Sequence, residues 1–275
     1  MVERKLISSE ELEEILEVLV HRYGYDFTGY SRSSLLRRVN RFTNKIAGGS
    51  SYDLKYSLLN NESVFHYFLQ EVTVNVTELF RDPIYYKTLR EKVFPILATY
   101  PVIKIWHAGC STGEEVYSMC ILLHEAGLLN RTKIYATDIN TVNLEKAKKG
   151  MMPLRNMKEY TNNYHQSGGK HDFTDYYTAR YDHALIKEEL RSPIIFSQHN
   201  LVSDNVFNEF QLISCRNVMI YFNKQLQNRV LGIFHESLAS LGFLTLGLKE
   251  TLQFSNLKDK FECIHPTAKI YRHKL

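Results

Sequence analysis

The stretch Ala108-Gly109-Cys110-Ser111-Thr112-Gly113-Glu114-Glu115 has the composition of a ligand-binding turn between a strand and a helix. Its two glycines, Gly109 and Gly113, allow the backbone to approach a ligand closely, as in dinucleotide-binding turns. Two glutamates follow directly, where a pyrophosphate group would need unobstructed N–H groups and no rival anions. The turn therefore disfavours a pyrophosphate ligand, and with it NAD.

A second candidate ligand-binding residue is Asp138, which follows a short apolar run about 25 residues beyond Gly113. An acid at the end of the second strand of such a fold accepts hydrogen bonds from ribose hydroxyls. These features together fit a nucleoside that has no phosphate and carries a positive charge that can interact with the acidic side chains. S-adenosylmethionine (AdoMet) is such a nucleoside. The alternative is structural: the glutamate pair favours the helix dipole, and Asp138 caps a helix.

The pattern of elements around these residues predicts a doubly wound, mostly parallel α/β sheet. Short apolar runs alternate with helical segments after residue 81, which is typical of βαβ units. In that fold, ligands bind beyond the carboxyl ends of the strands, where the strand order reverses. We expect strands at Val102–Trp106, Lys133–Thr137, Ile194–Ser197, Phe210–Cys215 and Phe243–Leu246, with Lys269–Arg272 as an antiparallel edge strand. We expect helices at 82–97, Glu114–Ala126, Thr141–Lys149 and Lys224–Leu241.

The first 80 residues read as helices only and predict a small helical domain that ends in a linker. Apolar residues recur at helical spacing after Ser8 and from Ser31 to about Ile46, and two shorter amphipathic segments follow at 52–59 and 64–72. Residues 81–275 form the predicted α/β domain. Within it, residues 151–191 are polar and rich in tyrosine, and they predict an inserted β-rich subdomain with strands near 173–177 and 184–190.

Composition excludes several classes of protein. With 44% hydrophobic and 23% charged residues, the chain is globular rather than disordered, collagenous or coiled-coil. The formal net charge of +4 is too small to indicate nucleic-acid binding. The four cysteines lack metal-ligand spacing, so we expect no metal site. An acidic start and the lack of a membrane-length apolar run lead us to expect a cytoplasmic protein without membrane insertion.

Three sequence blocks resemble the chemotaxis receptor methyltransferases, the CheR-type protein-glutamate O-methyltransferases. The blocks are Cys110–Glu115, Cys215-Arg216-Asn217-Val218-Met219-Ile220-Tyr221-Phe222, and Thr73-Val74-Asn75-Val76-Thr77-Glu78-Leu79-Phe80-Arg81, which is similar to that family's linker motif. The resemblance spans nearly the whole chain, and the two longer blocks are highly specific. It implies methyl transfer from AdoMet to glutamate carboxylates of a receptor-like signalling protein, with S-adenosylhomocysteine as the other product.

The resemblance also implies roles for individual residues. Beside the two glycines of the turn, it implies cofactor contacts by Asn75, Thr77, Arg81, Glu115, Asp138, Asn200, Leu201, Cys215 and Arg216. Arg81 and Tyr221 resemble residues that orient the substrate and the transferred methyl group. For Tyr221 the alternative is a core aromatic residue, and for Arg216 it is a structural ion pair. Cys215 is expected to be a buried small residue rather than a nucleophile, because nothing nearby in the sequence lowers its pKa.

The implied reaction needs no general base. A glutamate side chain has an ordinary pKa near 4.3, so it is already a carboxylate nucleophile at neutral pH. Two other functions stay open on the sequence. One is AdoMet-dependent methylation of another substrate, and the other is a non-catalytic scaffold that binds the nucleoside or a partner.

Charge is distributed unevenly in the N-terminal region. Residues 1–20 carry two bases and six acids, whereas residues 21–50 carry six bases and one acid. We expect Arg37, Arg38 and Arg41, on the predicted helix 31–46, to recognise the glutamate-rich helical domain of a receptor. The alternative is a solvated basic face, or one that pairs with the acidic first helix.

Overall fold

The computed structural model describes residues 6–73 and 77–274, and the chain divides into two compact units. One unit comprises the residues up to 75 together with the segment 221–227. The other comprises residues 76–220 and 228–275. Among the described residues, no helix has both the length and the apolar character needed to cross a membrane.

The described part of the first unit consists mainly of four α-helices, each of which buries an apolar side. They are α1 (Ser9–Tyr23), α2 (Arg32–Ile46), α3 (Ser51–Asn60) and α4 (Glu62–Val72). α1 begins with a capping box, in which Ser8 and Glu11 each accept the other's backbone N–H. Aromatic rings fill the interior, where Phe68 packs edge-to-face against Phe27 and Phe42. This helical unit agrees with the expected element type.

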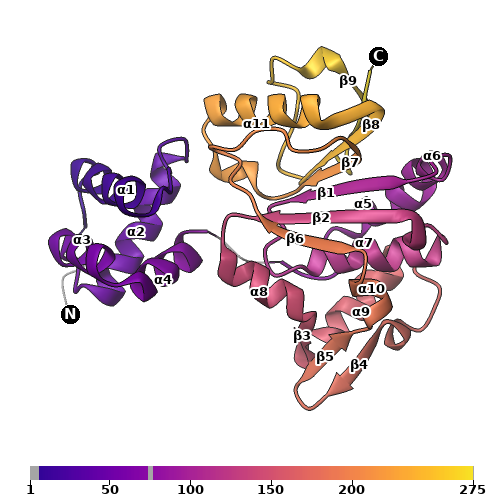
Figure 1. Ribbon diagram of the computed structural model, residues 1–275, viewed down its shortest axis with the longest axis horizontal. Helices are drawn as coiled ribbons and strands as arrows, with labels where there is room; N and C mark the ends of the chain where they lie inside the picture. Colours follow the sequence, from indigo (N-terminus) through magenta and orange to yellow (C-terminus); the bar gives the residue numbers. More distant parts are fainter. Residues whose placement is uncertain (1–5, 74–76, 275) are drawn as a thin grey trace. The chain divides into compact units, whose positions relative to one another are not determined.

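The second unit is built on a sheet that has seven strands in the described part of the chain (Figure 1). Its order is β6–β2–β1–β7–β8–β10–β9, in which β10 runs antiparallel to both neighbours and the other pairs are parallel. The strands are β1 (Ile103–Ala108), β2 (Thr132–Asp138), β6 (Ile194–Gln198), β7 (Phe210–Cys215), β8 (Leu238–Leu246), β9 (Phe261–His265) and β10 (Ile270–His273). The order reverses between β1 and β7, which confirms the doubly wound fold class and places the expected ligand edge at their carboxyl ends.

Helices cover both faces of this sheet (Figure 1), with α11 (Lys224–Ser237) on one side and α7 (Glu114–Glu125) on the other. Trp106 packs toward α11, where its ring centroid lies 5.3 Å from that of Phe234. Ile103 and Ile105 belong to the core cluster that includes the apolar residues of α7. Successive side chains of a strand point to opposite faces, so this strand is apolar on both.

The segment before β1 differs from the single helix predicted at 82–97. It is divided into α5 (Pro83–Thr88), a π-helical turn (Leu89–Val93) and α6 (Phe94–Leu97). Pro95 has no N–H and would clash with the carbonyl four residues before it, and the π-turn accommodates it. Asp82, at the N-cap position of α5, makes no side-chain cap hydrogen bond within the described residues, because its carboxylate pairs with Arg216 instead.

Two predictions about the C-terminal part are wrong in detail. The helix predicted to reach Leu241 ends at Ser237, and β8 begins at once. The predicted edge strand Lys269–Arg272 corresponds to β10, which lies between β8 and β9. The true edge is β9, whose mixed sequence Phe-Glu-Cys-Ile-His gives no apolar run for a sequence pattern to detect.

Residues 151–191 contain a second sheet, of order β3–β5–β4, with antiparallel pairing. Its strands are β3 (Met151–Pro153), β4 (Tyr177–Arg180) and β5 (His183–Ile186). Helix α8 (Thr141–Lys149) precedes this sheet in the chain, α9 (Met157–Gln166) lies between β3 and β4, and α10 (Glu188–Arg191) follows β5. The sequence prediction lacks α9, although Tyr160 and Tyr164 are buried at helical spacing. The strand expected near 173–177 is mostly a 3₁₀ turn that leads into β4.

Candidate functional site

The glycine turn after β1 is held against the end of β2. The N–H groups of Gly109 and Cys110 both donate to the carbonyl of Thr137, at 2.8 Å each. Gly109 has φ +81°, and a Cβ placed on it would lie 2.4 Å from Cγ2 of Val218. The loop after β7 therefore approaches this turn too closely for any side chain at position 109.

Asp138 ends β2 and projects its carboxylate at the same turn. Its Oδ2 accepts the N–H of Ser111 and its Oδ1 accepts the N–H of Asn140, both at 2.8 Å. Burial raises the pKa of Asp138, against the opposing effect of these N–H groups. The side chain of Asn143 and the N–H of Ile139 also donate hydrogen bonds to this carboxylate.

The polar groups of this turn fit a nucleoside. The buried Oγ of Ser111 has no hydrogen-bond partner among the described residues. An acceptor carboxylate beside a hydroxyl suits the two hydroxyls of a ribose. The described part of the turn offers acids rather than the bare N–H groups that a phosphate needs, so the donor set matches AdoMet better than a dinucleotide.

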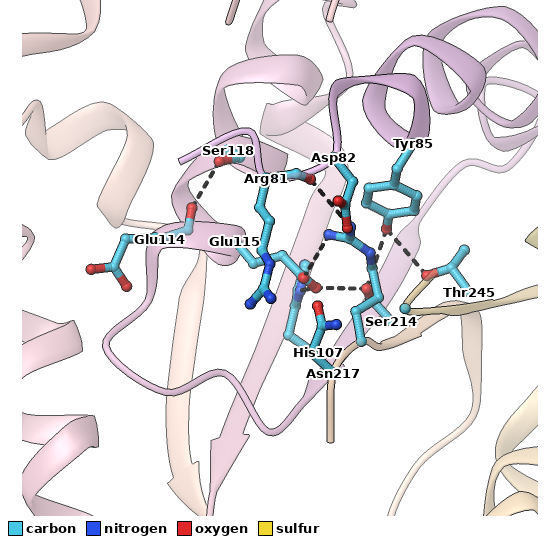
Figure 2. A network of polar contacts seen from close by, with 12 residues as sticks. Arg81, Asp82, Tyr85, His107, Glu114, Glu115, Ser118, Ser214, Asn217 and Thr245 are labelled. Atoms are coloured by element: carbon cyan, nitrogen blue, oxygen red, sulfur yellow. Dashed lines mark hydrogen bonds and ion pairs between the residues drawn. The ribbon is translucent and has the colours of Figure 1, made fainter. Parts of the chain in front are cut away.

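An ion-pair network centred on the buried Arg216 lies beside the turn (Figure 2). Arg216, which directly follows β7, donates to Glu115 Oε2 at 3.0 Å and to Asp82 Oδ2 at 2.7 Å. Glu115 Oε1 accepts from Ser214 Oγ at 2.6 Å and from His107 Nδ1 at 3.0 Å. The Arg216 side chain is only 1% exposed. The network ties α7, β1, β7 and the start of α5 together.

The pKa values of the two adjacent glutamates are shifted in opposite directions. Burial raises the pKa of Glu114, against a hydrogen bond from Thr112. Burial alone would also raise the pKa of Glu115, but the charge of Arg216 and the hydrogen bonds from His107 and Ser214 outweigh it and hold that pKa at about 2. Glu115 is thus the ionised partner of Arg216 at neutral pH.

Aromatic rings complete the surroundings of Arg216. Its guanidinium carbon lies 4.0 Å from the ring centroid of Tyr85. The Tyr85 hydroxyl lies 3.2 Å from Ser214 Oγ and 3.1 Å from Thr245 Oγ1. Burial, followed by the charge of Glu115, raises the pKa of Tyr85 to about 12, so the phenol stays neutral. Arg216 therefore forms structural ion pairs with Glu115 and Asp82, and its contact with the cofactor stays a prediction.

Arg81 lies between two residues with left-handed backbone conformation, Phe80 (φ 55°) and Asp82 (φ 59°). Such a conformation costs about 1–2 kcal/mol for a residue with a Cβ. Phe80 is held by its buried ring and by its N–H, which donates to Ser118 Oγ at 2.9 Å, and Asp82 is held by Arg216. Strain retained by such contacts is typical of functional sites, and it fixes the position of Arg81.

The remaining predicted cofactor residues lie at several places. Asn75 is outside the described residues, and Thr77 is half-buried in the segment before Arg81. Asn200 caps its own loop by accepting the N–H of Val202 at 3.0 Å, and Leu201 is buried. Cys215 is fully buried, and burial raises the pKa of its thiol well above the usual range.

Sequence reasoning missed Glu250, which fixes the loop after β7. Its buried carboxylate accepts the N–H groups of Asn217 at 2.9 Å, Val218 at 3.0 Å, Ile220 at 3.2 Å and Gly247 at 2.6 Å. Asn217 has φ 62°, which bends the loop back toward this carboxylate. Nothing in the surrounding Gly-Leu-Lys-Glu stretch marks this role, because the three partners in the loop are 30 to 33 residues away.

In the helical unit, the three arginines predicted as one basic surface are not equivalent. Arg37 is exposed, and so is Arg41, which pairs with Glu71 at 3.2 Å. Arg38 is only 8% exposed, and its guanidinium carbon lies 4.4 Å from the ring centroid of Tyr221. Unlike Arg37 and Arg41, Arg38 is thus buried against Tyr221, and its contact with a receptor stays a prediction.

Gly109→Ala is expected to destabilise the α/β unit by more than backbone strain alone. The matched control is Gly127→Ala: Gly127 has φ +67° and no atom within 4 Å of where a Cβ would lie, so the change should cost about 1 kcal/mol. The clash with Val218 should add about 1–3 kcal/mol at Gly109. Denaturant unfolding measures both, and the extra cost should shrink in a Val218→Ala background. Equal losses at the two glycines would contradict the close approach.

Glu115→Gln is expected to lower the free energy of unfolding of the α/β unit by about 3–5 kcal/mol, since it leaves Arg216 buried with one acid fewer. The carboxylate's contribution is present above its ordinary pKa of 4.5 and is lost as the pH falls through about 2. Unfolding curves of wild type and variant should therefore differ most above pH 4.5 and converge in acid.

The control for this prediction is Glu145→Gln, which removes an exposed pair with Lys148. Such a pair is worth about 1 kcal/mol at most. A Glu115→Gln loss no larger than the control's, or one that is independent of pH, would show that the network does not stabilise this unit.

Comparisons with known proteins show which family the chain resembles. Residues 75–270 match the family described as "CheR methyltransferase, SAM binding domain". A relative from Pseudomonas putida, named Cher3, is 47% identical over 95% of this chain and 96% of its own length. The chemotaxis protein methyltransferase of Salmonella typhimurium is 31% identical over 95% of this chain and 90% of its own length, and that of Escherichia coli is 28% identical over the same shares.

A solved structure of the glycopeptide N-methyltransferase MtfA complexed with sinefungin covers 62% of this chain and 50% of its own, with a TM-score of 0.39 and 9% identity, which is too distant to carry an argument. The family match covers well over half of the chain, and the Pseudomonas putida relative extends along nearly all of it. The chain therefore belongs to the CheR methyltransferase family and is an AdoMet-dependent methyltransferase.

Proposed function

We propose that this protein transfers the methyl group of AdoMet to glutamate side chains of a chemoreceptor-like signalling protein. The observation that carries the proposal is the membership of a family whose relatives are named chemotaxis protein methyltransferases. The site agrees with a substrate that needs no activation. Burial raises the thiol pKa values of Cys110 and Cys215, so neither supplies a thiolate nucleophile at neutral pH. A glutamate substrate is already ionised.

The chain's own residues would hold the cofactor along the carboxyl edge of the sheet. When bound, AdoMet supplies a methyl group carried by a positively charged sulfur. In the proposal, Asp138 accepts hydrogen bonds from the ribose hydroxyls, with Ser111 Oγ beside it. The Asn200–Leu201 loop lies against the adenine, and Asn75, Thr77 and Arg81 contact the cofactor from the linker.

The catalytic contribution of the protein is alignment rather than proton transfer. Oxygen, methyl carbon and sulfur must lie on one line, and such positioning can supply about 7–11 kcal/mol of a barrier. The carboxylate and the sulfonium both lose charge in the transition state, so an arginine that gripped the carboxylate tightly would oppose reaction. We therefore assign Arg81 and Tyr221 to orienting the substrate and the methyl group.

Recognition of the receptor is assigned to the exposed arginines of α2. Arg37 and Arg41 remain on the surface, and the Arg41–Glu71 pair is too exposed to prevent Arg41 from binding another carboxylate. A basic surface of this kind would steer a glutamate-rich helix and fix its register more than it would add affinity. The partner in the proposal is the cytoplasmic helical domain of a methyl-accepting receptor.

The type of bond formed tests the proposal directly. The protein is incubated with tritiated AdoMet and the cytoplasmic domain of a receptor, and the labelled receptor is then treated with base. We expect volatile labelled methanol, because carboxyl methyl esters hydrolyse in base whereas methyl groups on nitrogen do not. A receptor with its target glutamates changed to alanine is the control. Label that survives base treatment would contradict glutamate methylation.

Asp138→Ala is expected to weaken binding of S-adenosylhomocysteine, measured by calorimetry to avoid turnover. Loss of a hydrogen bond to a charged acceptor costs about 1.5–3 kcal/mol, or about 10- to 150-fold in Kd. Glu145→Ala, an acid on the exposed side of α8, is the matched control. An unchanged Kd in a folded Asp138→Ala protein would place the ribose elsewhere.

A further inference from the structure

We propose that Arg38 is a positioning residue that orients the phenol of Tyr221, an inference that rests on the function proposed above. The two residues are 183 positions apart in sequence but pack together within the helical unit. Arg38 thereby differs from its neighbours on α2, which are assigned to the receptor. Its action on the reaction goes through Tyr221 and involves no contact with substrate.

The first step of the argument is the unusual environment of Arg38. Its Nη1 donates to the carbonyl of Val72, the last residue of α4, at 2.6 Å. Its guanidinium lies over the ring of Tyr221, 4.4 Å from the centroid. In the described part of the chain, therefore, a carbonyl and the side chain of Tyr221, through its ring face and a hydrogen bond, meet this buried charge, and no ion pair with a carboxylate is formed.

Such a residue is a poor choice if stability were its only purpose. Burying a charge costs free energy that an apolar side chain of similar length would avoid. Burial lowers the pKa of Arg38, which is the sign of that cost. A flat cation, however, fixes the plane of an aromatic ring in a way that a flexible apolar chain does not. The cost is explained if the orientation of Tyr221 matters.

The backbone of Tyr221 is fixed at the same place. Its carbonyl accepts the N–H of Ser31, just before α2, at 2.7 Å. The next residue, Phe222, packs edge-to-face on Tyr30 with 5.0 Å between ring centroids. Because Ser31 holds the main chain and Arg38 covers the ring face, α2 and the residue that precedes it determine where the Tyr221 hydroxyl points.

The consequence is a division of labour along one helix. Arg37 and Arg41 are exposed and are assigned to binding the receptor, which should affect KM. Arg38 is buried on Tyr221 and should affect kcat. The three arginines are therefore expected to separate in kinetics, although they are close in sequence.

The test compares Arg38→Met, Tyr221→Phe and the double variant, using AdoMet and a receptor cytoplasmic domain with the full chain. Each single variant should lower kcat about 10- to 100-fold with KM for receptor unchanged, because misplacement of a reacting group has effects of this size. The double variant should be no slower than the slower single variant, because both remove the same oriented hydroxyl. Arg38→Lys can still donate to Val72 and should recover part of kcat.

Arg37→Met is the contrasting variant, and it should raise KM with little change in kcat. Two results would overturn the inference: a rise in KM without loss of kcat in Arg38→Met, or losses that multiply in the double variant. The first would return Arg38 to receptor recognition. The second would mean that Arg38 and Tyr221 act independently.

A measurement without catalysis separates this inference from the proposed function. In protein labelled at tyrosine rings, the NMR signal absent from Tyr221→Phe identifies Tyr221. That signal should shift in Arg38→Met and stay in place in Arg32→Met, a control on the same helix whose exposed partner is Glu13. If the Tyr221 signal has the same chemical shift in Arg38→Met as in the wild type, this inference is contradicted and the proposed function is not affected. A wild-type protein that forms no methyl ester on the receptor contradicts the proposed function.

Discussion

The pairing of Arg216 with Glu115 and Asp82 is the interaction on which the site depends. Each charge comes from a different segment: the end of β7, the first turn of α7, and the residue before α5. Arg216 cannot be buried alone, since an unpaired ion in the interior costs several kcal/mol. The segments must therefore come together as a unit. This requirement explains how Asp82 keeps a left-handed backbone and why the adjacent Arg81 has a fixed place.

The same network changes the interpretation of the glycine turn. The two glutamates that argued against a phosphate ligand have different partners. Glu115 turns inward to Arg216, whereas Glu114 accepts a hydrogen bond from Thr112. The conclusion that the cofactor is AdoMet is confirmed by the family match, and the acid that accepts a hydrogen bond from the turn itself is Asp138. The role of Glu115 is explained by the electrostatics of the fold.

Local patterns predicted what local physics determines. The helix that follows Ser8 and the strand–helix alternation follow from a few neighbouring residues. The parts that were missed depend on partners far along the chain. Asp82 meets Arg216 across 134 positions, and Arg38 lies on a ring supplied by residue 221. A charged residue on an amphipathic helix looks exposed until the structure shows what covers it, and no spacing rule contains that information.

The sequence block 215–222 is divided between the two units, and different interactions fix its two parts. Within the α/β unit, Glu250 gathers the N–H groups of the loop at 217–220. Within the helical unit, the residues from Tyr221 onward pack with α2 and the segment before it. The block must therefore supply a tight loop for a carboxylate and then, without a spacer, an aromatic pair for a helical core. That double requirement explains physically why so specific a run of residues occurs here. It also places the proposed catalytic tyrosine, by its packing, with the helix that is proposed to bind the receptor.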